Sequence, residues 1–258
     1  MPKADRFMRG DEWTPVEASL PAEDGRPNLV ACYRRARAHR GAGELFTELV
    51  SDRLGSFPAT AAIRLGIHPS VLTLTDFVLA VMASIVVIAH ADDAHSLWAP
   101  GLVGFVCWQL AYVLDCADGQ VARATGKQSD FGARVDVLVD FSVQSSIICA
   151  IVTVIARWSH RPIVLLAVFA TTWFVNLIVL ILGRADGNVG HSFSSSRRGT
   201  IRMIKLLRDY GFVLFIISGW LVVAPRSVII PVLAVTVVNG TFLVASIGRE
   251  AWLSMRGA

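Results

Sequence analysis

Charged side chains are scarce in this chain of 258 residues: Asp, Glu, Lys and Arg together make up 17% of it, whereas 54% of the residues are hydrophobic. The charges gather in particular stretches, and the long apolar runs between them are almost free of charge. This distribution argues against one or two soluble domains and is typical of an integral membrane protein. The formal net charge of +4 is therefore mainly a clue to how the chain is oriented in the membrane.

Two further features are missing. The first 66 residues contain no apolar stretch of the kind found in a cleavable secretory signal, so we expect the first apolar helix itself to direct insertion. No C-x-x-C or other metal-finger spacing is present, which excludes a cysteine-based metal site. We expect free thiols at Cys32, Cys107, Cys116 and Cys149.

Six apolar segments are long enough to cross a hydrocarbon core of about 30 Å, which takes about 20 helical residues. The fifth is the shortest, and its helix could begin earlier, within 204–207. The segments are 71–90, 97–114, 132–156, 162–182, 210–224 and 227–247. The sequence therefore predicts an all-α integral membrane protein with six transmembrane helices.

Lysine and arginine are distributed very unequally between the two sides of these six segments. Twenty-one fall in the two terminal regions, between the second segment and the start of the third with Arg134 included, and between the fourth and fifth segments, whereas three fall on the other side. Because positively charged loops stay cytoplasmic, we expect a multi-pass protein of the cell membrane with both termini in the cytoplasm.

The chain before the first span divides into two parts. Residues 1–43 are polar and read as a poorly ordered or loosely docked cytoplasmic extension. Residues 44–66 read as a juxtamembrane amphipathic segment, although Gly55 and Pro58 should break its helix. Residues 67–258 form the six-helix domain.

Four aspartates occur where the second and third apolar segments adjoin. Asp115 and Asp118 are spaced i,i+3, and Asp136 and Asp140 are spaced i,i+4, so each pair lies on one face of its own helix. The stretch between the pairs would form the turn that brings the two faces together. We therefore predict that four carboxylates converge on the cytoplasmic side.

A carboxylate inside an apolar helix costs about 2.5–3.5 kcal/mol, so Asp136 and Asp140 need compensation, which a cation would supply. Carboxylates without a histidine or thiolate partner form a hard oxygen site that suits Mg²⁺ or Mn²⁺. Two such ions could clamp a pyrophosphate and stabilise charge on the attacking and leaving oxygens.

Small residues and one arginine accompany the aspartates. Gly119 and Gly132 would let the backbone approach a nucleotide, and Ala122 would keep the helix face shallow. Arg123 supplies a fixed fork of donors for phosphate. The Asp-x-x-Asp-Gly segment alone is a weak signal, because a calcium-binding loop or a helix-end turn can have the same sequence.

The full pattern is D-x2-D-G-x2-A-R-x8-G-x3-D-x3-D, and it resembles without a departure the signature of the CDP-alcohol phosphotransferase (CDP-alcohol phosphatidyltransferase) family. The resemblance implies that Asp115, Asp118 and Asp136 hold a metal pair, and that Asp140 assists as a ligand or acts as general base on the acceptor hydroxyl. It also implies a homodimer. The implied CDP-binding residues are Gly119, Ala122, Arg123 and Gly132.

The implied reaction transfers a phosphatidyl group from a CDP-alcohol, such as CDP-diacylglycerol, to the hydroxyl of a small polar alcohol and releases CMP, as in phospholipid biosynthesis. Membrane lipids and the two substrates are the expected partners, and no nucleic acid is expected. The alternative is a membrane metal-ion or proton transporter, because intramembrane aspartates also mark ion pathways. Its weakness is that all four acids lie near one membrane face.

A basic run follows the fourth span, and 192–208 is a second candidate amphipathic helix. Positive-inside anchoring to anionic lipid would explain these charges. The functional alternative is that Arg197 and Arg198 bind a phosphate carried by the acceptor alcohol.

Polar residues outside the motif carry less weight. We expect Ser70 or Thr73 to cap the first transmembrane helix. Asp76 either follows as an acid near that cap, the interpretation we prefer, or points toward the nucleotide site. Packing or interhelical hydrogen bonding is expected of Trp108, Gln109, Tyr112, Asn176 and Asn239.

Overall fold

The computed structural model describes residues 28–39, 45–92, 97–158, 163–185, 206 and 209–256, and the regular structure within them is helical throughout. Four stretches are long and apolar enough to cross a membrane. They are α3 (Pro69–Ala89), α4 (Trp98–Thr125), α5 (Asp130–Trp158), and Pro225–Arg249, which comprises η3 (Pro225–Ser227) and most of α9 (Ile229–Arg256).

The fourth and fifth expected spans correspond to α6 (Ile163–Ala185) and α8 (Tyr210–Val223). Their described apolar portions, Ile163–Val179 and Tyr210–Val223, are shorter than the four spans. The all-α character is thus confirmed for the described residues, which include four candidate membrane-spanning helices and two shorter apolar helices. The number of six spans stays a prediction.

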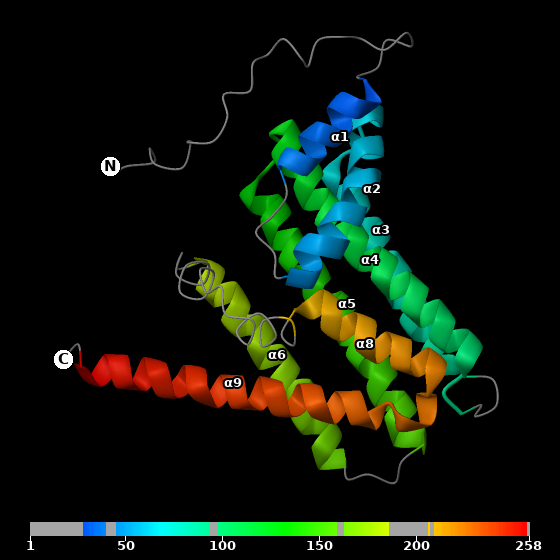
Figure 1. Ribbon diagram of the computed structural model, residues 1–258, viewed down its shortest axis with the longest axis vertical. Helices are drawn as coiled ribbons and strands as arrows, with labels where there is room; N and C mark the ends of the chain where they lie inside the picture. The colour runs from blue at the N-terminus through cyan, green and yellow to red at the C-terminus, as the bar shows by residue number, and fades with distance from the viewer. Residues whose placement is uncertain are drawn as a thin grey trace.

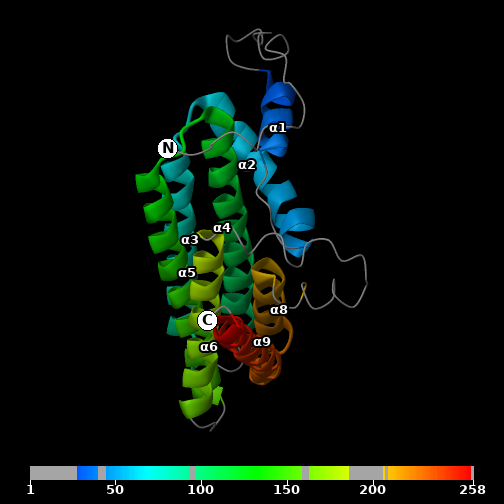
Figure 2. The ribbon, with the colours of Figure 1, turned by 90° about the vertical axis from the view of Figure 1, so that its left-hand side faces the viewer.

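Helices α3, α4 and α5 run side by side as the main bundle, with α8 against α4 (Figures 1 and 2). Trp108 is fully buried between them, and its indole N–H donates to the Ser84 hydroxyl at 3.1 Å. At the α4–α8 crossing, a Cβ on Gly101 would lie 2.7 Å from the carbonyl oxygen of Leu221. The glycine therefore permits this close approach. Helix α9 crosses α6 beside the bundle (Figure 1).

Helices α4 and α5 are longer than the spans expected from hydropathy. They have 28 and 29 residues, about 42 and 44 Å at 1.5 Å per residue, against a hydrocarbon core of about 30 Å. The chain turns only at Gly126, whose φ of 67° ends α4 in the left-handed conformation. The expected end of the second span at 114 was therefore too early, and the motif residues lie within helices instead of in a long turn.

Two helices precede the bundle at the end where α4 finishes: α1 (Leu29–Ala38), then α2 (Asp52–Leu65), which follows the π-helical turn η2 (Thr47–Ser51) (Figure 1). The expected break at Gly55 and Pro58 was wrong, because α2 is continuous through both. A Cβ on Gly55 would lie 3.0 Å from the Val113 carbonyl oxygen, so this glycine lets α2 lie directly on α4. The packing that results offsets the cost of proline within a helix.

The expectation that residues 1–43 form a loose extension was wrong for α1. Ala36 is fully buried in a small core with Ala59, Ala62 and Val121, which come from α2 and α4. Cys32 is also buried. Helix α1 is thus part of the packed structure, and residues 1–27 and 40–44 lie outside the described residues.

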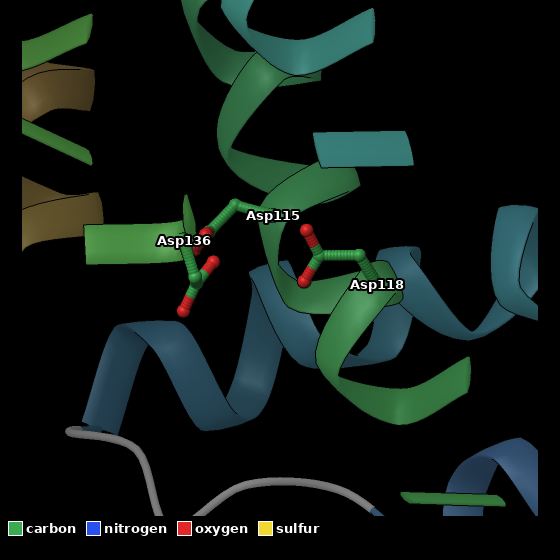
Figure 3. A group of neighbouring side chains, drawn as sticks. All are labelled: Asp115, Asp118 and Asp136. Atoms are coloured by element: carbon green, nitrogen blue, oxygen red, sulfur yellow. The ribbon is translucent and has the colours of Figure 1, made fainter. Parts of the chain in front are cut away.

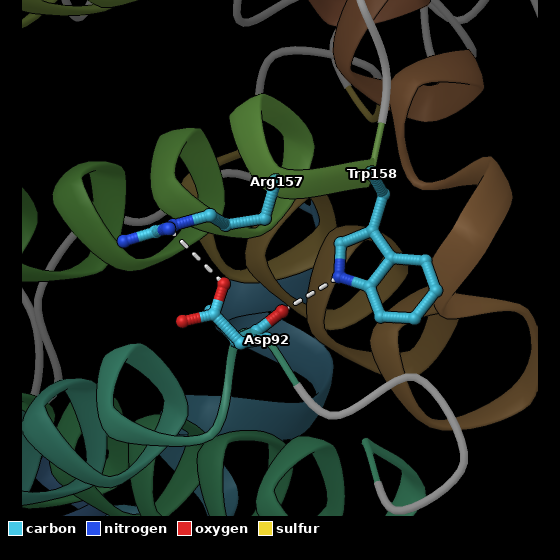
Figure 4. Close-up of polar contacts among 4 residues, drawn as sticks. Asp92, Arg157 and Trp158 are labelled. Carbon is cyan, nitrogen blue, oxygen red and sulfur yellow. Dashed lines mark hydrogen bonds and ion pairs between the residues drawn. The ribbon is translucent and has the colours of Figure 1, made fainter.

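At the opposite end of the bundle, polar contacts join the turn after α3 to the end of α5 (Figure 4). Arg157 Nη1 lies 3.2 Å from Asp92 Oδ1, and the Trp158 indole N–H donates to the Ala91 carbonyl oxygen at 2.7 Å. The Arg226 guanidinium lies over the Trp158 ring at 5.6 Å. Two of the three arginines on the side predicted to be non-cytoplasmic therefore have specific partners.

All four cysteines are free thiols, as predicted.

Candidate active site

Three of the four predicted aspartates form one cluster between α4 and α5 (Figure 3). Asp115 and Asp118 come from α4 and Asp136 from α5, and one carboxylate oxygen of each lies within 4.8 Å of the others. This spacing arises because α4 continues as a helix through Asp118 and turns back at Gly126 into α5. Three carboxylate oxygens this close can share a divalent ion.

Asp140 lies one helical turn further along α5 than Asp136. It lines a small cavity together with Asp76 of α3, Asp115 and several aromatic side chains. The aromatic residues are Trp108, Tyr112 and Tyr210. Four predicted carboxylates and an additional one from α3 therefore gather around Asp115, among α3, α4 and α5.

The start of α3 differs from the prediction. His68 is the N-cap, because its ring accepts a hydrogen bond from the Ser70 amide at 3.3 Å, and Pro69 occupies the first helical turn. Neither Ser70 nor Thr73 is the cap. Proline favours this first-turn position because it has no amide hydrogen to satisfy there.

Thr73 and Asp76 consequently face the site instead of the helix end. The buried Thr73 hydroxyl donates to Asp118 Oδ2, and Asp76 is 3% exposed, well past the first turn. The preferred interpretation of Asp76 as an acid near the cap was therefore wrong. The signal was available, because Asp76 is the only charged residue in residues 69–89 and a lone intramembrane acid indicates function.

The predicted CDP-binding residues Gly119, Ala122 and Arg123 continue the α4 face that carries the aspartates. A Cβ on Gly119 would lie 3.0 Å from Arg123 Nη1, so the missing side chain leaves room for the guanidinium. Arg123 Nε donates to the main-chain carbonyl oxygen of His39, at the end of α1, at 2.6 Å. Helix α1 therefore fixes the orientation of this arginine.

The fourth predicted CDP-binding residue, Gly132, lies in the first turn of α5. Its amide donates to the Ser129 hydroxyl at 3.0 Å, which is the geometry of an N-cap. Arg197, Arg198 and the candidate helix 192–208 lie outside the described residues, apart from the single residue Leu206.

A buried polar joint supports the aromatic side of the cavity. Asp209, fully buried before α8, accepts hydrogen bonds from the Thr47 amide at 2.9 Å and the Thr47 hydroxyl at 2.7 Å. The Thr47 hydroxyl also contacts the Tyr112 hydroxyl at 2.8 Å, and Asp209 caps α8 through the Gly211 amide at 3.0 Å. The expectation that Tyr112 only packs was incomplete, because Tyr112 both lines the cavity and belongs to this joint.

The donor set of the cluster fits a hard divalent cation. The three ligands are carboxylates, and Cys116, the nearest thiol in sequence, lies instead against Gly55 of α2. Oxygen-only sites suit Mg²⁺ or Mn²⁺ better than zinc. The residues present therefore match a site for such an ion.

Comparisons with known proteins agree with this geometry. Residues 66–247, more than two thirds of the chain, match the family model described as CDP-alcohol phosphatidyltransferase. The chain is also 26% identical over 134 residues to a protein of Archaeoglobus fulgidus named "Bifunctional IPC transferase and DIPP synthase". That alignment covers 52% of this chain and 24% of the relative, so the chain spans only a part of the relative's length.

The matched region includes all four predicted aspartates and Asp76, and it favours a transferase over the transporter alternative. The chain therefore belongs to the CDP-alcohol phosphatidyltransferase family.

Proposed function

We propose that the protein transfers a phosphatidyl group from CDP-diacylglycerol to the hydroxyl of a small polar alcohol and releases CMP, in phospholipid biosynthesis. The observation that carries this proposal is the cluster of Asp115, Asp118 and Asp136 within a chain that matches the family over residues 66–247. Asp140 and Asp76 beside that cluster give it a second set of acids that can act on the acceptor.

Asp115, Asp118 and Asp136 would hold Mg²⁺ or Mn²⁺, with Asp140 near enough to assist, and the family signature suggests two ions. When bound, such ions neutralise the pyrophosphate and stabilise charge on the attacking and leaving oxygens. Thr73 would keep the Asp118 carboxylate in a fixed orientation, as partners of metal ligands commonly do.

The chain's own residues would complete the reaction at the cytoplasmic face. Asp140 would accept the proton of the acceptor hydroxyl while the hydroxyl oxygen forms a bond to the lipid-bearing phosphorus. The bond from that phosphorus to the CMP oxygen breaks, and CMP leaves. Gly119, Ala122, Arg123 and Gly132 would line the CDP site, and a homodimer is the proposed assembly.

Purified protein with CDP-diacylglycerol and a mixture of alcohols tests this function. We expect CMP and a new phospholipid with Mg²⁺ or Mn²⁺, and neither product with EDTA. Full turnover in chelator would refute the metal assignment. A protein that releases no CMP but conducts protons or divalent ions across proteoliposomes would support the transporter alternative instead.

We also propose that the acceptor carries a phosphate of its own. Arg197 and Arg198 belong to a basic run that exceeds what a short loop needs for orientation. A second anion beside a pyrophosphate requires such cations, because like charges otherwise repel. In this proposal the two arginines bind the acceptor phosphate.

A further inference from the structure

A second cavity lies next to the aspartate site and has a different chemistry. It is lined by residues of α5, α6, α8 and α9 and has a volume of about 70 Å³, enough for several water-sized groups. Its polar and aromatic lining consists of Gln144, Trp173, Asn176, Tyr210 and Asn239. The described lining includes no charged side chain.

Asn176 presents an unused acceptor in this cavity. Its side chain is 7% exposed, and its Nδ2 donates to the Thr172 carbonyl oxygen at 2.8 Å and to the Asn239 carbonyl oxygen at 3.2 Å. These two carbonyl partners fix which end of the amide is nitrogen. The buried Oδ1 atom is left without a partner among the described residues, an arrangement that costs free energy unless a donor fills it.

Gln144 is also held in place. Its Oε1 accepts a hydrogen bond from the Trp173 indole N–H at 2.8 Å, and the residue is buried. This bond fixes the side-chain amide at the cavity wall. Two oriented amides and two aromatic rings at one small cavity form a lining suited to hydroxyl groups, which both donate and accept hydrogen bonds.

The second cavity adjoins the site of the reaction. Gln144 follows Asp140 by four residues on α5, so both lie on the same helix face. Tyr210 lines both cavities, and Val143 of the aspartate cavity precedes Gln144 directly. The amide groups of the second cavity therefore lie next to the acid proposed to act on the acceptor hydroxyl, one helical turn along α5 and across the shared Tyr210 ring.

We infer that this amide-lined cavity is the acceptor subsite, and that it binds the neutral, hydroxyl-bearing part of a polyol. The inference rests on the proposed transferase function and narrows its acceptor class. Because the lining carries no charge, a phosphate or an ammonium group on the acceptor would have to lie outside the cavity. The cavity therefore favours a polyol over an amino alcohol.

The test compares acceptors that differ by one non-reacting hydroxyl. The probes are glycerol 3-phosphate, myo-inositol and myo-inositol 1-phosphate, each paired with a monodeoxy analogue, together with serine. In the unmodified protein we expect kcat/KM for the used polyol to exceed that for its analogue by about fivefold or more. In Asn176→Leu and Gln144→Leu this ratio should fall to about one, while the KM for CDP-diacylglycerol is retained.

Thr236→Val is the matched control, because the buried Thr236 hydroxyl donates to the Val232 carbonyl oxygen of its own helix and does not line the cavity. It should preserve the ratio. A purely structural effect of the Asn176 or Gln144 substitution would lower turnover of both acceptors alike and leave the ratio intact, which would overturn the inference.

The remaining outcomes distinguish failure of the acceptor subsite from failure of the proposed transferase function. CMP release with an unchanged polyol ratio in both leucine variants, or CMP release with serine alone, would overturn the subsite and leave the transferase function standing. Absence of CMP release with every probe would overturn the transferase function, and the acceptor subsite with it.

Discussion

Among individual residues, Thr73 has the clearest supporting role in the candidate site. Its hydroxyl is buried and donates to Asp118, one of the three clustered carboxylates. A carboxylate that accepts this bond has less freedom to rotate away from an ion. Thr73 is therefore a positioning residue: it would orient the Asp118 carboxylate and would not itself bind the ion.

Thr73→Val should therefore weaken divalent-ion activation while leaving the fold intact. Loss of a partner that orients a metal ligand typically costs about 10-fold to 100-fold in metal affinity. We expect the Mg²⁺ concentration for half-maximal CMP release to rise by that factor. Thr75→Val is the matched control, since the exposed Thr75 hydroxyl donates to the Val71 carbonyl oxygen of its own helix. If both variants require the same Mg²⁺ concentration, Thr73 does not position a metal ligand.

Substitution of Asp136 and substitution of Asp140 should impair the enzyme in different ways. Asp136 belongs to the three-carboxylate cluster, whereas Asp140 lines the neighbouring cavity. Asp140→Asn should lower kcat by about 100-fold to 10,000-fold, the usual contribution of a general base, with CDP-lipid and metal binding largely kept. Asp136→Asn should lose metal-dependent binding of the donor as well.

Binding of Mn²⁺ and of CDP-diacylglycerol, measured separately from turnover, distinguishes these two variants. If Asp140→Asn loses both ligands as completely as Asp136→Asn, Asp140 is better described as a metal ligand than as a base.

The sequence predicted the acids that lie in a spaced pattern, whereas it gave Asp76 a place in the site only as the less favoured alternative and assigned Thr73 to a helix cap. Asp115, Asp118 and Asp136 follow helical spacing, and their convergence needed only a turn between two helices. Asp76 and Thr73 come from a third helix, so their contribution depends on how α3 packs against α4. Residue spacing within one helix contains no information on that packing.

Among the helical elements, α1 has the least expected role. Its C-terminal carbonyl accepts the hydrogen bond of Arg123, and its buried face packs on α2 and α4. Sequence analysis could not foresee this, because alanine and cysteine on a short polar helix give little hydropathy signal. The continuous helix α2 was missed for a related reason: Gly55 and Pro58 have poor helix propensity, which close packing on α4 overrides.

Removal of residues 1–40 should weaken donor binding through Arg123. A hydrogen bond to a charged group contributes about 1.5–3 kcal/mol, so we expect the KM for CDP-diacylglycerol to rise by about 10-fold to 100-fold. Removal of residues 1–27 keeps α1 and is the control. If the longer deletion acts through Arg123, its effect and that of Arg123→Ala should not add in the double variant. Additive effects would show that α1 acts only through general stability.

For the whole molecule, the polar ends of the bundle make the proposed orientation testable. Lys127 is exposed in the turn after α4, beside the aspartate end, whereas His90 is exposed at the end of α3, beside Asp92 and Arg157. In intact cells a membrane-impermeant maleimide should label His90→Cys but reach Lys127→Cys only after permeabilisation. The parent chain gives the background from its four native thiols. The reverse labelling pattern would invert the proposed topology.

The bond from Arg123 to the His39 carbonyl has a further consequence for how this protein can diverge. A main-chain oxygen is present whatever residue occupies position 39, so selection on the contact acts on the shape of α1 and not on the identity of its amino acids. The matched family region begins at residue 66, after α1 and α2. Two homologues can therefore keep the same support for the arginine at this position while their amino-terminal sequences drift until no similarity between them can be recognised.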